Sequence, residues 1–379
     1  MKIKLTTITP VHISTRNSYT LLEGIVSGNI FYKLDPFSFI NSEEKLREFT
    51  NWLEKESNPK LSEFLNRDNS SIKEKCIYKA NCNYSEDDIS EIMECIKSGN
   101  IPYIPGTSVK GCIRTILLWW WIKSNPKENF FFLKEELKKI TRTRKGKLAK
   151  VLGEEIIKKI FNCSANPKNS DAKYDILRFL LVSDFSATDY TLSINRVNVY
   201  SFGKGKKKTF FIEGVEGEFI GEIKLNIPLM RRCINNKEFS LLWDKLSFFG
   251  FNEEELTNYE EERLNSIFIN HFEKLCKEYY KWCLEKEEHL KEYIKYPNEL
   301  MENSNFIRIG FGTGTIYKTV IKLIEERNAK IFLDIVNNFK LGKYPRMLAN
   351  NKLNPPFPKT CKVLDNGYPL GWLKWEKSC

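Results

Sequence analysis

The segment Ile101-Pro-Tyr-Ile-Pro-Gly-Thr-Ser-Val-Lys-Gly-Cys-Ile-Arg-Thr115 joins a rigid turn to the start of a helix. Pro105 and Gly106 favour a turn. Thr107 and Ser108 are of the types that cap the exposed N–H groups of a first helical turn. We therefore expect a helix that begins at this turn and continues through the apolar residues that follow it.

Two basic residues lie on one face of this expected helix. Lys110 and Arg114 are four residues apart. They lie beside the positive end of the helix dipole, where free backbone N–H groups favour a phosphate. The segment thus predicts an anion-binding helix start. The alternative is an ordinary capped helix with solvated basic residues.

The composition favours a polyanionic partner. The chain has 379 residues, which suits two domains with a core each. It carries 60 Lys and Arg against 49 Asp and Glu, a net charge of +11. Aromatic residues make up 13% of the chain, so rings are available for stacking on bases, although most should lie in the core.

The cysteines and histidines do not predict a metal site. Ten cysteines are scattered without a CxxC pair, and only three histidines could join them. We expect the thiols to be small buried groups and no cofactor or metal. The N-terminus lacks a signal-like pattern and the longest apolar run is too short to span a bilayer, so we expect a cytoplasmic protein without a membrane partner.

Four parts of the chain, the last of them made of two tail segments, resemble motifs of one known family in the family's order. The segment Ile104–Arg114 is similar to the IPGSSLKGxxR motif of the RAMP superfamily, the repeat-associated RNA-binding subunits of CRISPR effector complexes. Leu5-Thr-Thr-Ile-Thr-Pro-Val-His-Ile13 resembles the opening LTPVHIG, with Ser14 in place of the glycine. The glycine-rich turn 308–314 and the tail segments 358–362 and 367–372 are most similar to the fifth subunit of type III-A (Csm) complexes.

This resemblance implies a fold and a function. The fold would be α+β, with two ferredoxin-like (RRM-related) domains carrying helical insertions, at residues 1–230 and 231–379. The function would be a non-catalytic RNA-binding subunit that caps the 3′ end of the guide RNA (crRNA) and supports its maturation in antiviral defence. Its partners would be single-stranded crRNA, target RNA, other Csm subunits and host nucleases.

Two residues near the N-terminus are candidates for catalysis. His12 follows a predicted strand, in a polar loop with Ser14 and Arg16 that could lie along RNA. Related RAMP ribonucleases suggest His12 as a general acid or base, whereas a loop histidine often only makes a hydrogen bond. Asp35 resembles the target-cutting aspartate of some filament subunits, but its place before Pro36 favours a helix cap.

Further basic residues are candidates for RNA contact. Residues 180–185 and 192–199 are predicted strands with a loop between them, and Arg196 lies on the polar face of the second. A lysine-rich turn then leads to a predicted hairpin at 210–226, which in relatives is thumb-like and wedges between bases. The candidates in these and other polar segments are Arg142, Arg144, Lys145, Lys147, Arg196, Lys206, Lys207, Lys359 and Lys362. Each segment could instead be a solvated turn.

The turn Arg308-Ile-Gly-Phe-Gly-Thr-Gly314 lets the backbone approach another group closely. In RAMP folds this loop lies against the guide strand, which implies contacts from Arg308, Gly310, Gly312, Gly314 and Lys318. A dinucleotide site is the alternative. The spacing does not fit G-x-G-x-x-G, and the surrounding pattern is not βαβ.

Two other classes of function compete with RNA binding. A metal-independent endoribonuclease that processes CRISPR RNA would use His12 as its general acid or base. A protein-only scaffold would use the amphipathic pattern at 253–294, which predicts two helices with a polar side of alternating Glu and Lys. We expect residues 368–375 to close a second sheet in the C-terminal domain.

Overall fold

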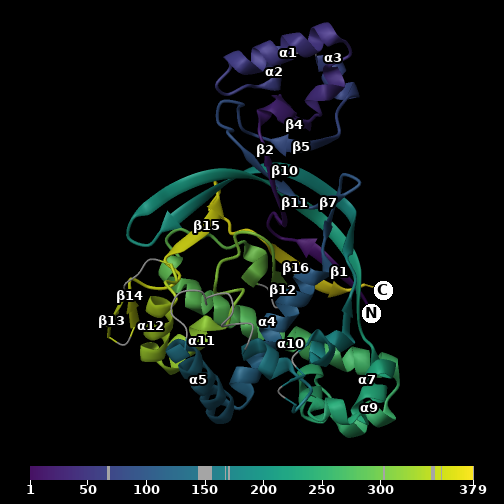
Figure 1. Ribbon diagram of the computed structural model, residues 1–379, viewed down its shortest axis with the longest axis vertical. Coiled ribbons are helices and arrows are strands. Elements are labelled where there is room, and N and C mark those ends of the chain that lie inside the picture. Colours follow the sequence, from purple (N-terminus) through teal and green to yellow (C-terminus); the bar gives the residue numbers. More distant parts are fainter. Residues whose placement is uncertain are drawn as a thin grey trace.

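A long, curved β-hairpin crosses the centre of the computed structural model (Figure 1), which describes residues 1–65, 69–143, 156–166, 168–169, 171–301, 304–342, 346–350 and 352–378. Its strands are β10 (Phe185–Ser201) and β11 (Gly205–Leu225), paired from Ser186↔Ile220 to Ser201↔Gly205. The predicted hairpin at 210–226 is therefore wrong, because these residues form a single strand. The predicted loop after residue 185 is also strand. In this part of β10 the side chains on both faces are exposed, so the alternation of apolar and polar residues that marks a half-buried strand is lost. The backbone of this part still pairs with β11.

The hairpin lies in the middle of one sheet, which contains strands from both halves of the chain. Its main path runs β12 (Phe306–Arg308), β16 (Trp372–Lys377), β1 (Lys2–Thr7), β11, β10, β5 (Tyr78–Cys82), β4 (Ile30–Lys33) and β3 (Gly24–Ser27). Branching strands are β2 (Ser14–Tyr19), β6 (Ile92–Cys95), β7 (Lys97–Ser98), β8 (Ile101–Ile104), β9 (Leu180–Val182) and β15 (Thr360–Leu364). A separate ribbon pairs β13 (Met347–Ala349) with β14 (Lys352–Asn354).

The sequence pattern suggested that the C-terminal strand closes a second sheet, and this prediction is wrong. Strand β16 lies antiparallel to β1, with Ile3 opposite Lys377, and the two chain ends are neighbours in Figure 1. The main apolar core likewise joins residues from both halves, including Ile3, Phe219 and Trp375. The fold is α+β, and the division into two ferredoxin-like domains at residue 230 stays a prediction.

The predicted helix after the Pro-Gly turn is confirmed as α4 (Gly106–Ser124), which packs against α10 (Glu261–Glu287) through Trp119. The other helices are α1 (Glu43–Lys55), α2 (Leu61–Phe64), α3 (Asn69–Glu74), α5 (Pro126–Thr143), residues 156–161, α7 (Ile227–Ile234), α8 (Leu242–Lys245), α9 (Glu253–Asn258), α11 (Ile321–Arg327) and α12 (Ala329–Asn338). Short 3-10 turns are η1 (Leu21–Glu23), η2 (Pro36–Phe39), η3 (Ala172–Tyr174), η4 (Ile176–Phe179), η5 (Lys237–Phe239), η6 (Leu246–Phe249), η7 (Glu288–Leu290) and η8 (Asn298–Met301).

Helices α1 to α3 and strands β3 to β5 form a module beyond the hairpin, drawn in purple at the top of Figure 1. It has its own apolar cluster, which includes Tyr32, Phe39 and Phe49. The Asp35 carboxylate accepts the Phe37 N–H at 3.0 Å, so the interpretation of Asp35 as a cap is confirmed. No motif predicted this module.

A buried carboxylate ties the first hundred residues to the hairpin. Glu213 of β11 is fully buried. It accepts hydrogen bonds from the Tyr19 hydroxyl at 2.6 Å and the Cys95 N–H at 2.8 Å, and it also contacts the Tyr78 hydroxyl and the Lys97 ammonium. Since an unpaired buried charge is costly, β2, β5, β6 and β7 must all be in place around β11.

Three segments far apart in the sequence meet at one point. The Phe311 N–H donates to the His12 carbonyl at 2.7 Å, the Gly371 N–H to the Pro10 carbonyl at 3.0 Å, and the Ile309 N–H to the Gly371 carbonyl at 2.9 Å. Gly310 has a φ of +90°, and a Cβ there would lie 2.5 Å from the His12 carbonyl oxygen. The glycine-rich turn is therefore packed against the N-terminal loop.

We predict that Gly310→Ala destabilises the fold by about 3 kcal/mol, because it combines an unfavourable φ with a backbone overlap. The control is Gly314→Ala, where φ is +80° but a Cβ would meet open space. It should cost about 1 kcal/mol, from φ alone. Urea unfolding of the two variants measures the difference, and equal losses would contradict the packing of the turn.

We predict that Glu213→Gln costs roughly 3–5 kcal/mol, because the buried Lys97 ammonium loses its nearest carboxylate and keeps only Glu94 at 3.9 Å. Glu216→Gln is the matched control, since Glu216 lies on the same strand but is exposed. It should change the free energy of unfolding by less than about 0.5 kcal/mol. Thermal unfolding followed by circular dichroism tests both, and a stable Glu213→Gln variant would refute the role given to this carboxylate.

Candidate functional site

The start of α4 is occupied by a carboxylate of the protein itself. The Gly106 N–H donates to Asp184 Oδ1 at 2.7 Å. Pro105 is the cap residue and makes no side-chain capping bond, so the predicted cap by Thr107 or Ser108 is wrong. A residue distant in the sequence satisfies the positive helix end, which a local pattern cannot reveal.

Lys110 and Arg114 are likewise engaged internally. The Lys110 ammonium donates to the Leu180 carbonyl at 2.7 Å, and burial lowers the pKa of Lys110. The Arg114 guanidinium forms a 2.6 Å ion pair with Asp175 and lies over the Phe161 ring. Both side chains therefore help to hold residues 175–180 against α4, and their contact with RNA stays a prediction.

His12 is buried. Its Nδ1 lies 2.8 Å from the Glu213 carbonyl oxygen, and its ring packs edge-on against Phe311. Burial lowers the pKa of His12, so the neutral form is favoured. A general acid or base must reach the substrate, and His12 does not reach the surface in this conformation.

Arg308 is also buried, with 3% of its surface exposed. Its Nε donates to the Leu370 carbonyl at 3.0 Å, and its guanidinium faces Glu287 at 3.5 Å and the Tyr317 ring at 4.2 Å. The cation thus serves an internal network. Because its side chain is buried, Arg308 does not reach the surface where the expected contact with RNA would form.

Two lysines of the glycine-rich segment and the tail lie at the surface near each other. The Lys318 ammonium donates to the Gly310 carbonyl at 2.7 Å, and Lys362 lies over the Phe311 ring at 5.0 Å. Burial lowers the pKa of both lysines, and the charges of Lys362 and Arg308 lower that of Lys318 further. Among the described residues no carboxylate pairs with either lysine. A bound phosphate would relieve this repulsion.

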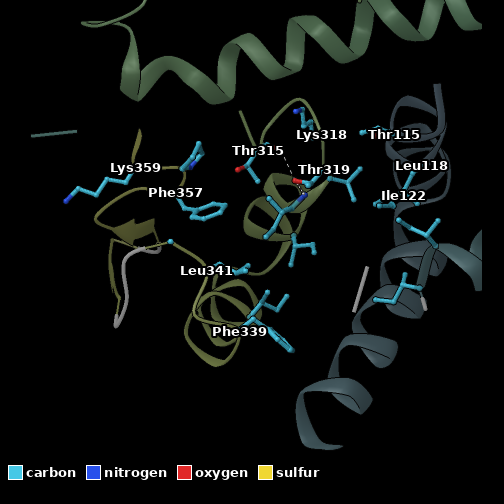
Figure 2. A pocket seen from close by; sticks show the side chains of 18 of the residues that line it. Thr115, Leu118, Ile122, Thr315, Lys318, Thr319, Phe339, Leu341, Phe357 and Lys359 are labelled. Atoms are coloured by element: carbon cyan, nitrogen blue, oxygen red, sulfur yellow. Dashed lines mark hydrogen bonds between the residues drawn. The ribbon is translucent and has the colours of Figure 1, made fainter. Parts of the chain in front are cut away.

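A cavity of about 600 Å³ opens beside Lys318. Figure 2 shows Thr115, Leu118 and Ile122 of α4 on one side and Phe339, Leu341 and Phe357 on the other, with Thr315 and Thr319 between them. Four predicted RNA contacts belong to its lining, namely Arg114, Lys207, Lys318 and Lys359. The described lining residues include no Asp or Glu.

The remaining predicted residues do not line this cavity. Gly310 and Gly312 face the interior of the fold, while Gly314 faces open space. Ser14 and Arg16 begin β2, where Arg16 adopts a φ of 76°, and Lys206 is exposed beside the hairpin turn. Arg196 pairs with Asp365 at 2.7 Å. Arg142 lies in the last turn of α5, and three predicted residues lie outside the described part of the chain, namely Arg144, Lys145 and Lys147.

Sequence reasoning missed the hydroxyl and aromatic lining of the cavity. Thr319 lies in a segment whose apolar residues recur with a helical period, and Phe357 lies in a proline-rich stretch. Neither carries a signal beyond ordinary core composition. Ser201 also lines the cavity, although its position at a strand end predicts nothing.

The thiols behave as expected from their scattered spacing. Of the nine described cysteines, eight are buried and Cys76 is half-buried. Across the described residues, no group of three His, Cys, Asp or Glu side chains is placed to hold a metal ion. None of the described helices is long and apolar enough to cross a membrane.

Comparison with known proteins identifies the family. The model of the RAMP superfamily matches residues 4–317. A protein of Methanocaldococcus jannaschii named CRISPR system Cms protein Csm5 is 26% identical over 311 residues, which are 75% of this chain and 65% of that protein. A protein of Streptococcus thermophilus with the same name is 36% identical over 146 residues, 34% of this chain and 39% of that protein. The chain thus spans less than two thirds of either relative.

The fold agrees with two solved structures over nearly the whole chain. One is a chain of a Csm–crRNA–target RNA ternary complex of a type III-A CRISPR-Cas system, with a TM-score of 0.71, 19% identity and coverage of 99% of this chain and 100% of that chain. The other is the crystal structure of T. onnurineus Csm5, with a TM-score of 0.61, 18% identity and coverage of 98% and 99%. The predicted resemblance is confirmed, and the chain belongs to the RAMP superfamily.

Proposed function

We propose that this protein is a non-catalytic RNA-binding subunit of a type III-A (Csm) CRISPR effector complex. The observation that carries the proposal is the surface formed by Lys318 and Lys362, with Lys207 and Lys359 at the adjoining cavity. Lys318 and Lys362 repel one another, and neither pairs with a carboxylate of the described residues, so these two cations are suited to a polyanion. We name this the lysine surface.

RNA is the polyanion that its relatives favour. The relatives in Methanocaldococcus jannaschii and Streptococcus thermophilus are named Csm5, and a chain of similar fold belongs to a complex that contains crRNA and target RNA. Phosphates would supply most of the affinity, so binding depends little on base sequence. Exposed rings add stacking, for example Phe202, which is 36% exposed beside the hairpin turn.

Within such a complex we place the protein at the 3′ end of the crRNA. There it caps the guide, contacts other Csm subunits and the target RNA, and leaves the end to host nucleases for maturation in the cytoplasm. Two features support a capping role over a thumb that wedges between bases. The hairpin strand β10 pairs with β15 up to Ser201↔Thr360, and the Phe202 N–H donates to the Lys359 carbonyl at 2.9 Å. The hairpin end is thus fastened to the body of the protein.

The competing proposal is an endoribonuclease that uses His12. Its support is the position of His12 in a family motif, and its difficulty is burial of the ring against Glu213 and Phe311. A protein-only scaffold would leave the lysine surface without a role. Arg114→Glu is a poor test of that idea, because it places a second carboxylate against Asp175.

We predict that Lys207→Gln/Lys362→Gln weakens binding of short single-stranded RNA. Each lost phosphate contact should reduce the slope of log affinity against log salt by about 0.7, because fewer counterions are released. Fluorescence anisotropy over a range of salt concentrations measures the slope.

The matched control is Lys277→Gln/Lys281→Gln, which removes the same charge from exposed positions on α10. It should leave the slope within error of the unaltered protein. A loss of affinity that is equal in the two double variants would show that net charge, and not the lysine surface, binds RNA.

We further predict that the protein leaves end-labelled RNA intact, with or without EDTA, on denaturing gels. Fragments that persist in EDTA and disappear in His12→Ala would establish the endoribonuclease instead. His271→Ala controls for loss of fold, since His271 is a half-buried histidine packed against Trp120, away from the lysine surface.

A further inference from the structure

Aliphatic side chains form the largest part of the wall of the cavity beside Lys318. Figure 2 shows Leu118 and Ile122 of α4 on one side, and Phe339, Leu341 and Phe357 on the other. The volume of about 600 Å³ lies within the ~300–1,000 Å³ range of small-ligand pockets. Because water would find few hydrogen-bond partners along such a wall, the cavity favours an apolar ligand.

The polar groups of the wall are largely engaged as donors within the protein. The Thr115 hydroxyl donates to the Gly111 carbonyl at 3.1 Å, and the Thr319 hydroxyl donates to the Thr315 carbonyl at 2.9 Å. The Arg346 guanidinium donates to two backbone carbonyls at 3.0 and 3.1 Å. A ligand with polar edges, such as a sugar or a base, would therefore find few donors here, whereas an apolar chain needs none.

The charge of the wall has one sign. The described lining residues include no Asp or Glu, and the cations among them are Arg114, Lys207, Lys318, Arg346 and Lys359. The Lys318 ammonium donates to the Gly310 carbonyl at 2.7 Å, which uses one of its three N–H groups. Burial and the charges of Lys362 and Arg308 lower the pKa of Lys318. A bound carboxylate would offset this repulsion.

We propose that this cavity is a binding site for an apolar chain that ends in a carboxylate, the chemistry of a medium-chain fatty acid. The chain lies against the aliphatic wall, and the carboxylate accepts hydrogen bonds from the Lys318 ammonium. The inference goes beyond the proposed function, because the site needs no RNA. Since Lys318 also belongs to the lysine surface, an occupied cavity leaves one cation fewer for a polyanion.

The first test is a series of carboxylates of increasing chain length, measured by isothermal titration calorimetry below the concentrations at which they form micelles. Affinity should rise about fourfold for each methylene added from hexanoate through octanoate to decanoate, because each methylene leaves water for the apolar wall. Acetate has no chain and should not bind measurably. An affinity that does not depend on chain length would overturn the inference.

Two substitutions fill the cavity without changing charge. Thr319→Trp enters from the position shown in Figure 2 and should weaken decanoate more than hexanoate, so that the dependence on chain length is lost. Thr115→Trp enters the same cavity from α4 and serves if Thr319→Trp does not fold. Thr257→Trp is the matched control, because its hydroxyl also bonds the carbonyl four residues earlier at 2.9 Å, but it is exposed on α9. It should keep the full dependence.

Comparison with the uncharged alcohol decanol tests the role of Lys318. Decanoate should bind about fivefold more tightly than decanol, which is the scale of a partly exposed charge pair. Lys318→Gln should remove this difference and leave the affinity for decanol unchanged. Lys281→Gln removes the same charge from an exposed position on α10 and should keep the difference. Equal binding of the two ligands by the unaltered protein would overturn the anionic class of ligand.

A decanoate with a photoreactive diazirine at the end of its chain locates the site without any substitution. After irradiation, peptide mapping should find the label within residues 115–122 or 335–341. Phe37 and Phe131 are 64% and 63% exposed, so label at these rings would indicate adventitious binding to the surface and overturn the inference. All of these measurements omit RNA, and their failure would leave the proposed function standing.

Discussion

The buried carboxylate of Glu213 is the contact on which the N-terminal half of the molecule depends. Tyr19, Tyr78 and Lys97 come from three separate strands and meet on this one side chain. A carboxylate removed from water is tolerated only when its partners are complete, so the arrangement is close to all-or-none. It fastens the strands that carry the outlying helical module to the middle of the central hairpin, and the carbonyl of the same residue receives the ring of His12.

The family motifs act first as packing elements. The glycine-rich turn, the N-terminal loop and the tail meet through backbone hydrogen bonds, and Gly310 is needed because the His12 carbonyl lies where a side chain would be. This packing has a consequence for the surface. It sets Lys318 over the turn and brings Lys362 of the tail beside Phe311, so two distant segments contribute to one positive surface.

Some of the predicted basic residues make contacts inside the protein and others lie at its surface, and the residue type alone does not tell the two groups apart. Lys110, Arg114 and Arg308 hold the fold together through a carbonyl, a carboxylate and a buried network. Lys318 and Lys362 repel each other at the surface, where a polyanion is the natural partner. The family motifs therefore include basic residues that make their contacts inside the protein.

Local pattern by itself predicted the helix after the Pro-Gly turn, the cap at Asp35, the burial of the cysteines and, through four motifs, the superfamily. Those features depend on residues one to four positions apart, which sequence displays directly. Only the tertiary structure decided that Asp184 accepts from the helix start, that β16 joins β1, and that Lys318 and Lys362 lie close enough to repel each other. Each of these joins residues that are far apart in the chain, and no local period records such contacts.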